Sequence, residues 1–137
     1  MKKFISILLS CCILMALAVP AFAAEKEPPQ ATPRYDYAVY TSASLTISSN
    51  GMAVCTSKVS SMGKVTGADI YMELQKWDGR EWDFVDSWLE YVSGSSPTLR
   101  KTIPVSKGSY QVIADFTIHG NDGGSEPASA ISTTVTY

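Results

Sequence analysis

The segment from Asp36 to Tyr137 consists of short runs of β-forming residues with turn-forming residues between them. No stretch of it has the apolar spacing of an amphipathic helix, and prolines interrupt several runs. The expected strands are residues 37–48, 52–61, 68–77, 82–91, 97–105, 109–118 and 128–137. Seven strands at this spacing predict an all-β domain, a two-sheet sandwich with Greek-key connections.

Alternation within the runs indicates which side chains face the interior. In the run at 68–77, Tyr71, Glu73 and Gln75 share one face and three apolar residues share the other. A large apolar side chain that becomes fully buried stabilises such a sandwich by about 1.5–3 kcal/mol. The inward set expected from two runs is Ile70, Met72, Leu74, Tyr110, Val112, Ala114 and Phe116.

The first 23 residues are arranged like a secretory signal peptide. Two lysines precede an apolar run from Phe4 to Val19, and small residues follow at Ala21 and Ala23. Signal peptidase accepts small side chains at these two positions, so we expect cleavage after Ala23 and a secreted, extracellular protein. The run stops at Pro20, short of the roughly 20 apolar residues that span a bilayer, which favours cleavage over a retained anchor.

A lipoprotein is the alternative. Leu8-Leu9-Ser10-Cys11 resembles a lipobox, in which the cysteine is acylated and becomes the new N-terminus. Cleavage there would leave a very short apolar region and would strand the residues from Ile13 to Val19 on the mature protein. We therefore expect Cys11 and Cys12 to be ordinary signal-peptide residues, and the mature chain to carry no stable membrane anchor.

Residues 24–35 are expected to form a disordered, proline-rich linker, and residues 36–137 a single domain. Cys55 is the one cysteine beyond the signal peptide, so packing without a disulfide must hold the domain together. The full chain has a formal charge of −2, and cleavage removes two lysines and no acid. The mature chain therefore has 9 basic and 13 acidic residues, a formal charge of −4, and this net negative charge argues against nucleic acid as a partner.

Two segments resemble parts of immunoglobulin domains. Ser106-Lys107-Gly108-Ser109-Tyr110-Gln111-Val112 is similar to the corner that leads into the sixth strand, and the segment from Gly51 to Cys55 is similar to the second strand as far as its cysteine. The resemblance implies that the Tyr110 hydroxyl bonds back to nearby backbone. It also implies that Cys55 faces an apolar partner in place of a disulfide mate.

A longer series of motifs resembles small secreted proteins of Gram-positive anaerobes. The series runs from Ser-Asn-Gly at 49–51, through Trp82-x-x-Val85-x-x-Trp88, to the final Thr-Val-Thr-Tyr. The resemblance covers most of residues 40–137 and implies an immunoglobulin-like or fibronectin-III-like sandwich outside the cell. It implies nothing about chemistry.

The residues offer little catalytic or metal-binding chemistry. Cys55 and His119 form the one conceivable nucleophile pair, but Cys55 is expected inside the core, where a thiol stays protonated. One histidine and one cysteine cannot complete a tetrahedral zinc site. The loop at 121–126 offers three side chains for calcium, and we interpret it as a solvated turn. We expect no enzyme activity, no metal and no cofactor.

Aromatic residues gather on the two runs around Asp78-Gly79-Arg80-Glu81. If these four residues form the loop, Trp77 pairs with Trp82, Tyr71 pairs with Trp88, and Leu74 shares the inward face with Val85. One interpretation is that tryptophans fill the core or cover a sheet edge. The other is an exposed recognition patch made of Tyr71, Trp77, Trp82, Phe84 and Trp88.

The function expected from these observations is a secreted, non-enzymatic binding or structural domain whose partner is an extracellular protein or a glycan. A more specific alternative is a carbohydrate-binding module that uses the aromatic face. A small hydrolase or protease inhibitor is a third hypothesis, which the missing nucleophile, acid and base disfavour.

Overall fold

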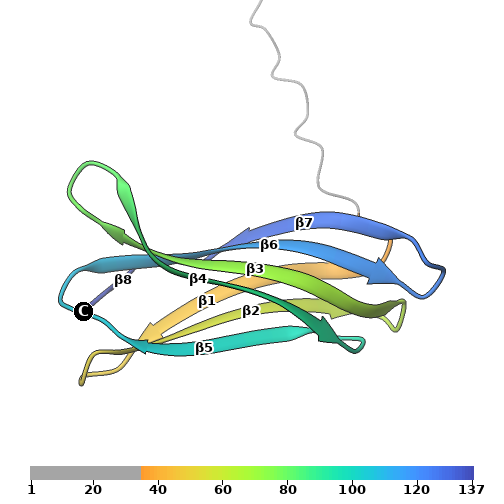
Figure 1. Ribbon diagram of the computed structural model, residues 1–137, viewed down its shortest axis with the longest axis horizontal. Helices are drawn as coiled ribbons and strands as arrows, with labels where there is room; N and C mark the ends of the chain where they lie inside the picture. Colours follow the sequence, from red (N-terminus) through yellow and green to blue (C-terminus); the bar gives the residue numbers. More distant parts are fainter. Residues whose placement is uncertain (1–34) are drawn as a thin grey trace, which may run out of the picture. The chain divides into compact units, whose positions relative to one another are not determined.

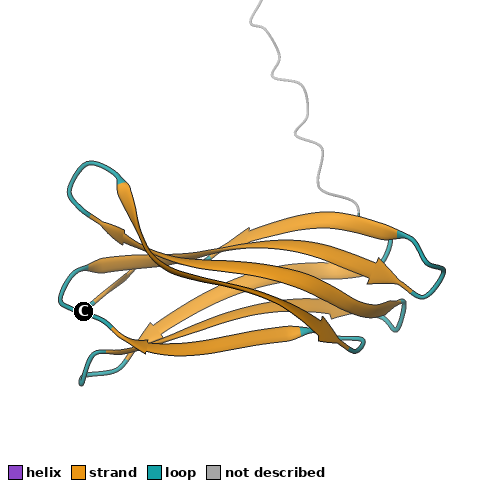
Figure 2. Cartoon of the chain, viewed as in Figure 1, coloured by secondary structure: helices purple, strands orange, loops and turns teal. Residues whose placement is uncertain are grey.

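Eight β-strands and their connecting turns make up residues 35–137, the part of the chain that the computed structural model describes (Figures 1 and 2). The strands are β1 (Ala38–Ile47), β2 (Met52–Ser61), β3 (Val65–Trp77), β4 (Trp82–Ser93), β5 (Thr98–Pro104), β6 (Ser109–Gly120), β7 (Ser125–Ile131) and β8 (Val135–Thr136). The expected signal peptide at 1–23, and the expected linker up to residue 34, lie outside the described residues. No helix among the described residues could cross a membrane.

The strands form two antiparallel sheets that pack as a sandwich. One sheet has the order β1-β2-β5, and the other has the order β4-β3-β6-β7 with β8 also paired to β6 (Figure 1). In immunoglobulin terms, β1, β2 and β5 occupy the positions of strands A, B and E, and β4, β3, β6 and β7 those of C′, C, F and G. The expected all-β, immunoglobulin-like Greek-key sandwich is confirmed.

The last strand differs from the expectation. The sequence predicts one strand at 128–137, but the structure has β7 and β8 with Ser132, Thr133 and Thr134 between them. Three residues here lie opposite two residues of β6, so regular pairing cannot continue. The Ser132 side chain fills the gap, because the Val112 N–H donates to its Oγ over 2.8 Å. Seven expected strands therefore become eight.

The core lies between the sheets and follows the predicted alternation. Ile70, Met72 and Leu74 are each 0% exposed, while their neighbours on β3 face solvent in part. The inward residues predicted on β6 are buried as well. Tyr35, at the end of the expected linker, packs against this core. The buried core cluster is Ala38, Leu45, Ala53, Cys55, Val59, Val65, Ala68, Ile70, Met72, Leu74, Leu99, Tyr110, Val112, Ala114, Phe116 and Ile118.

A tyrosine corner fixes the connection from β5 to β6, as the resemblance implied. Tyr110 is 1% exposed, and its hydroxyl donates to the Ser106 carbonyl oxygen over 2.8 Å. Lys76 covers the corner, with its Nζ 5.6 Å from the centre of the Tyr110 ring and 2.9 Å from Ser106 Oγ. Gly108 has a φ of 152°, a backbone conformation that residues with a Cβ rarely adopt, so this corner favours glycine.

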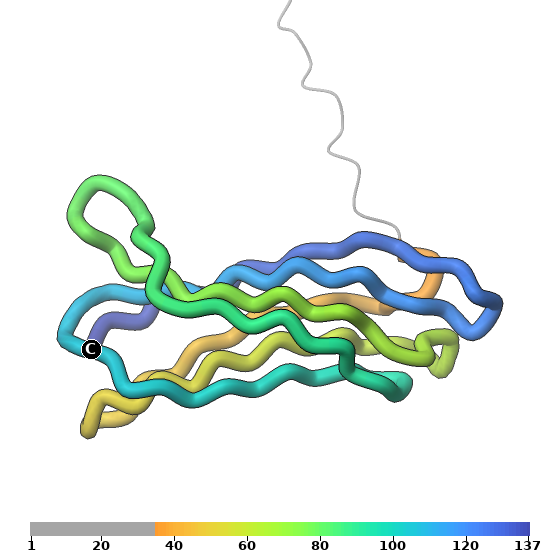
Figure 3. Tube along the Cα trace, in the orientation of Figure 1, coloured from red at the N-terminus to blue at the C-terminus, as the bar shows by residue number. Residues whose placement is uncertain are grey.

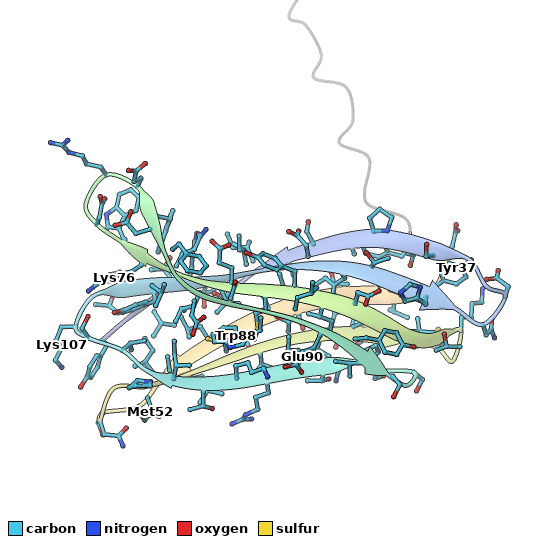
Figure 4. All side chains as sticks on the ribbon, viewed as in Figure 1. Tyr37, Met52, Lys76, Trp88, Glu90 and Lys107 are labelled. Carbon is cyan, nitrogen blue, oxygen red and sulfur yellow. The ribbon has the colours of Figure 1, made fainter. Side chains whose placement is uncertain are left out.

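Tyr137 closes the same end of the sandwich, next to Lys107, which Figure 4 labels. Its N–H donates to the Gly108 carbonyl oxygen over 2.8 Å, and its ring packs against Gly51, whose φ is 81°. Lys107 Nζ lies 3.7 Å from the centre of that ring. The ring therefore connects the turn after β1 to the turn before β6.

The tyrosine corner predicts a specific loss of stability. Tyr110→Phe removes one hydrogen bond without changing the shape of the buried ring, so the free energy of unfolding should fall by about 1 kcal/mol. Urea denaturation measures the change. Tyr40→Phe is the control, because Tyr40 is 52% exposed and should change stability by less than about 0.5 kcal/mol. Equal stability of the two variants would contradict a structural role for the corner.

Candidate binding face

The outward side chains of the five-stranded sheet form one continuous surface, which we call the outer face. Because Ile70, Met72 and Leu74 point inward, the alternate residues of β3 and their cross-strand partners point outward. The outer face comprises Asp69, Tyr71, Glu73, Gln75 and Trp77 on β3, Trp82, Phe84, Ser87, Leu89 and Tyr91 on β4, Gln111, Ile113, Asp115, Thr117 and His119 on β6, and Pro127, Ser129 and Ile131 on β7.

Four of the five aromatic residues singled out in the sequence lie on this face. Trp77 pairs with Trp82, as expected, and Phe84 and Tyr71 lie farther along the same side. Trp77 is 40% exposed and Phe84 is 63% exposed. Trp88 does not join them. It lies opposite Met72, packs half-buried against the core, and appears between the two layers in Figure 4.

A β-bulge at Val85 explains the change of side. Leu74 pairs with Asp86 and Gln75 pairs with Phe84, so Val85 has no partner on β3. The extra residue shifts every later residue of β4 by one position. The expected pairing of Tyr71 with Trp88 is therefore wrong, since Tyr71 lies opposite Leu89. The expected inward placement of Val85 is also wrong, because it is 36% exposed.

The same bulge places two residues on the outer face that the sequence interpretation missed. Leu89 is 71% exposed and Tyr91 is 57% exposed. The Tyr91 ring lies over Gly67, where a Cβ would be 2.7 Å from the Tyr91 Cζ. Once the bulge is known, Trp88 faces inward, and alternation from Trp88 onward then places Leu89 and Tyr91 on the outer side.

Trp77 and Trp82 form an indole pair at one end of the outer face. Their ring centres are 5.4 Å apart and the planes are tilted by 57°. Together with Ser109 and Thr134 they line an open groove of about 280 Å³. The pair lies at the base of the β3–β4 hairpin loop, which projects from the two layers in Figure 3.

Asp78 holds the hairpin loop in shape. Its Oδ1 accepts the N–H of Arg80 over 2.6 Å and the N–H of Glu81 over 2.8 Å. These two hydrogen bonds lower the pKa of the Asp78 carboxyl, and the bond from the Glu81 N–H has the larger effect. The carboxylates of Asp78, Glu81 and Asp83 lie within 4.8 Å of one another, an exposed acidic group that the sequence interpretation missed although all three fall within six residues.

A row of polar side chains crosses the middle of the outer face. Gln111 Nε2 donates to Gln75 Oε1 over 2.9 Å, and Gln75 Nε2 donates to Glu73 Oε1 over 2.8 Å. The Tyr71 hydroxyl donates to Glu73 Oε2 over 2.5 Å, and this bond raises the pKa of Tyr71. The row is thus held in place before any ligand arrives, which lowers the entropy lost on binding.

Cys55 and His119, the conceivable nucleophile pair, lie in different sheets. Cys55 is 0% exposed on β2 and packs in the core with Val112. Burial, with a smaller contribution from the Asp86 charge, raises the pKa of the Cys55 thiol to about 11. His119 Nε2 lies 2.7 Å from Asp69 Oδ2, and its ring lies 5.9 Å from that of Tyr91. The two residues do not form a catalytic pair.

The loop at 121–126 was interpreted as a solvated turn, but its acids bind the protein itself. Asp122 Oδ1 accepts the Gly124 N–H and the Tyr37 hydroxyl, which lowers the pKa of Asp122 and raises that of Tyr37. Glu126 accepts the backbone N–H groups of Asp36, Tyr37 and Ala38 over 2.6–3.1 Å. The loop therefore fixes the start of β1.

No protein family model matches the chain, and no curated protein matches it in sequence. Among solved structures it is similar to wild-type OgpA from Akkermansia muciniphila and to the CARDB domain of the PF1109 protein from Pyrococcus furiosus, which was solved in complex with di-metal ions. Each has a TM-score of 0.37 and 10% identity over 77% of this chain. The matches cover 30% of OgpA and 97% of the CARDB domain, so this chain spans less than a third of OgpA. Strand order and the Tyr110 corner, rather than these similarities, identify the fold.

The buried thiol predicts slow labelling of Cys55. Raising a thiol pKa from 9.0 to about 11 lowers its thiolate fraction about 100-fold at pH 8, and burial slows access further. In protein carrying Cys11→Ser and Cys12→Ser, a disulfide-exchange dye should therefore react at least about 100-fold more slowly in the native state than in urea. Rapid native labelling would show that Cys55 is accessible and reactive.

Proposed function

We propose that this protein is an exported, non-enzymatic binding domain whose outer face recognises a glycan. One observation carries the proposal. The exposed rings of Trp77 and Phe84 and the half-buried ring of Trp82 share a single sheet face with a fixed row of amide and carboxylate groups. Sugars present apolar C–H faces that stack on aromatic rings, and hydroxyls that bond to amides and carboxylates. The outer face offers both kinds of contact side by side.

The size and exposure of the outer face support a polymeric ligand. Phe84 and Tyr91 are separated by about 20 Å along β4, at roughly 3.3 Å per residue. A surface of this length suits several sugar units in a row. The exposed large apolar residues along it are Trp77, Phe84, Leu89, Tyr91 and Ile131, and apolar side chains gathered on one exposed face are typical of an interaction site.

The separation of Cys55 from His119 supports a non-enzymatic role, and the signal-peptide pattern supports export. A protein partner is the alternative ligand. A glycan array separates the two classes of partner directly. A glycan-binding face should bind some sugars on the array and not others, whereas a protein-binding face should bind none of them selectively.

Export makes a testable prediction about the N-terminus. When the full chain is expressed in a secreting bacterial host, the medium should contain a protein that begins at Ala24, identified by N-terminal sequencing and intact mass. Ala23→Leu should block this cleavage, because the peptidase pocket excludes large side chains. A lipid-modified N-terminus at Cys11, or an uncleaved protein in the cytosol, would refute free secretion.

Substitutions on the outer face test glycan binding. Trp82→Ala and Phe84→Ala should each weaken retention on an immobilised polysaccharide at least about tenfold, since an aromatic contact at a binding centre contributes about 2 kcal/mol and tenfold corresponds to about 1.4 kcal/mol. Tyr40→Ala is the matched control, an exposed aromatic residue of the other sheet. Thermal unfolding of all variants checks the fold.

Trp88→Ala distinguishes the two roles of tryptophan. Because Trp88 packs against the core, this change should lower the unfolding temperature. Glycan binding that survives Trp82→Ala and Phe84→Ala in folded protein would refute the proposed face.

A further inference from the structure

Charge is divided unequally between the two sheets. The strands of the three-stranded sheet carry three basic residues, Lys58, Arg100 and Lys101, and no acid. The strands of the five-stranded sheet carry one lysine or arginine, Lys76, against seven acids. The acids are Asp69, Glu73, Asp83, Asp86, Glu90, Asp115 and Glu126.

Three of these acids, and no lysine or arginine, lie on the outer face. Asp69, Glu73 and Asp115 point outward, whereas Lys76 packs over the tyrosine corner on the other side of the sheet. Within residues 35–137 the ion pairs are Lys101 with Glu90 and His119 with Asp69. Glu73 and Asp115 therefore have no basic partner among the described residues.

The hydrogen bonds of the polar row point the same way. The Gln75 amide and the Tyr71 hydroxyl both donate hydrogen bonds to Glu73, and the Gln111 amide donates one to Gln75. These bonds use donor groups and leave spare lone pairs on the Glu73 and Asp115 carboxylates. The middle of the face thus presents acceptors and negative charge to a ligand.

The groove at the end of the face has the same electrostatic character. Its lining is two indoles and two hydroxyl-bearing residues. Of the acidic group, Asp78 and Glu81 belong to the loop that joins the indoles, and Asp83 follows Trp82 on β4. Aromatic faces attract cations, and nearby carboxylates add to that attraction. An anionic ligand would be repelled along the whole face.

We propose that the outer face selects glycans that carry free amino groups, such as a glucosamine polymer, over neutral or anionic ones. This rests on the proposed glycan-binding function and names its ligand class. An ammonium group supplies three donors and a positive charge, which the unpaired carboxylates of Glu73 and Asp115 accept. The sugar rings stack on Phe84 and on the Trp77–Trp82 pair.

Two tetrasaccharides of equal length test the selection. Isothermal titration of the purified protein at about pH 6 and low salt compares a glucosamine tetramer with an N-acetylglucosamine tetramer, in which each ammonium is replaced by a neutral amide. The glucosamine tetramer should bind at least about tenfold more tightly. The ratio should shrink at 0.5 M salt, where the screening length is only a few ångströms.

Charge-removing variants locate the effect. Glu73→Gln and Asp115→Asn should each lower the ratio of the two affinities about threefold or more. Asp36→Asn is the matched control, because it removes the same charge outside the outer face and should leave the ratio unchanged.

The outcomes separate the inference from the function on which it rests. Equal affinity for the two tetramers, or tighter binding of an oligoglucuronate, overturns the selection for amino groups and leaves glycan binding intact. Binding of no glycan on the array, including both tetramers, overturns the proposed function itself.

Discussion

The two sheets hold together only because the inward rows of their strands exclude water without help from a covalent crosslink. Ile70, Met72 and Leu74 form the central inward row of the larger sheet, and Cys55 occupies the middle of the smaller one. Each inward position fixes its neighbours on the strand as outward positions, because side chains alternate across a sheet. The existence of an outer face is therefore a direct consequence of the core.

The outer face depends on one irregularity in that alternation. Without the bulge at Val85, β4 would direct Trp88 to solvent and Leu89 to the interior. The bulge reverses both, so an indole fills the edge of the core while Leu89 and Tyr91 extend the exposed apolar row. One extra residue therefore determines both which side chain packs into the core and which side chains are exposed on the outer face.

The polar features of the domain divide between its two ends and its face. At the ends, charged groups stabilise the fold. Glu126 binds the backbone at the start of β1, and Lys76 packs over the tyrosine corner. On the outer face, hydrogen bonds from Tyr71 and Gln75 hold Glu73 in place, but neither Glu73 nor Asp115 has a basic partner among the described residues. Negative charge that no basic residue of the described domain neutralises is the basis for assigning these carboxylates to a ligand.

Local signals in the sequence were enough to predict the sandwich, the inward rows and the Trp77–Trp82 pair, because alternation and tight turns act over a few residues, and the immunoglobulin resemblance implied the Tyr110 corner. The side of the sheet on which Trp88 lies, the break at Ser132 and the sharing of one sheet by Glu73 and Asp115 came only from the tertiary structure. The position of a bulge depends on how the strand pairs with its partner. The grouping of strands into sheets depends on contacts between segments that are far apart in the chain. Neither property is contained in the spacing of residues along the chain.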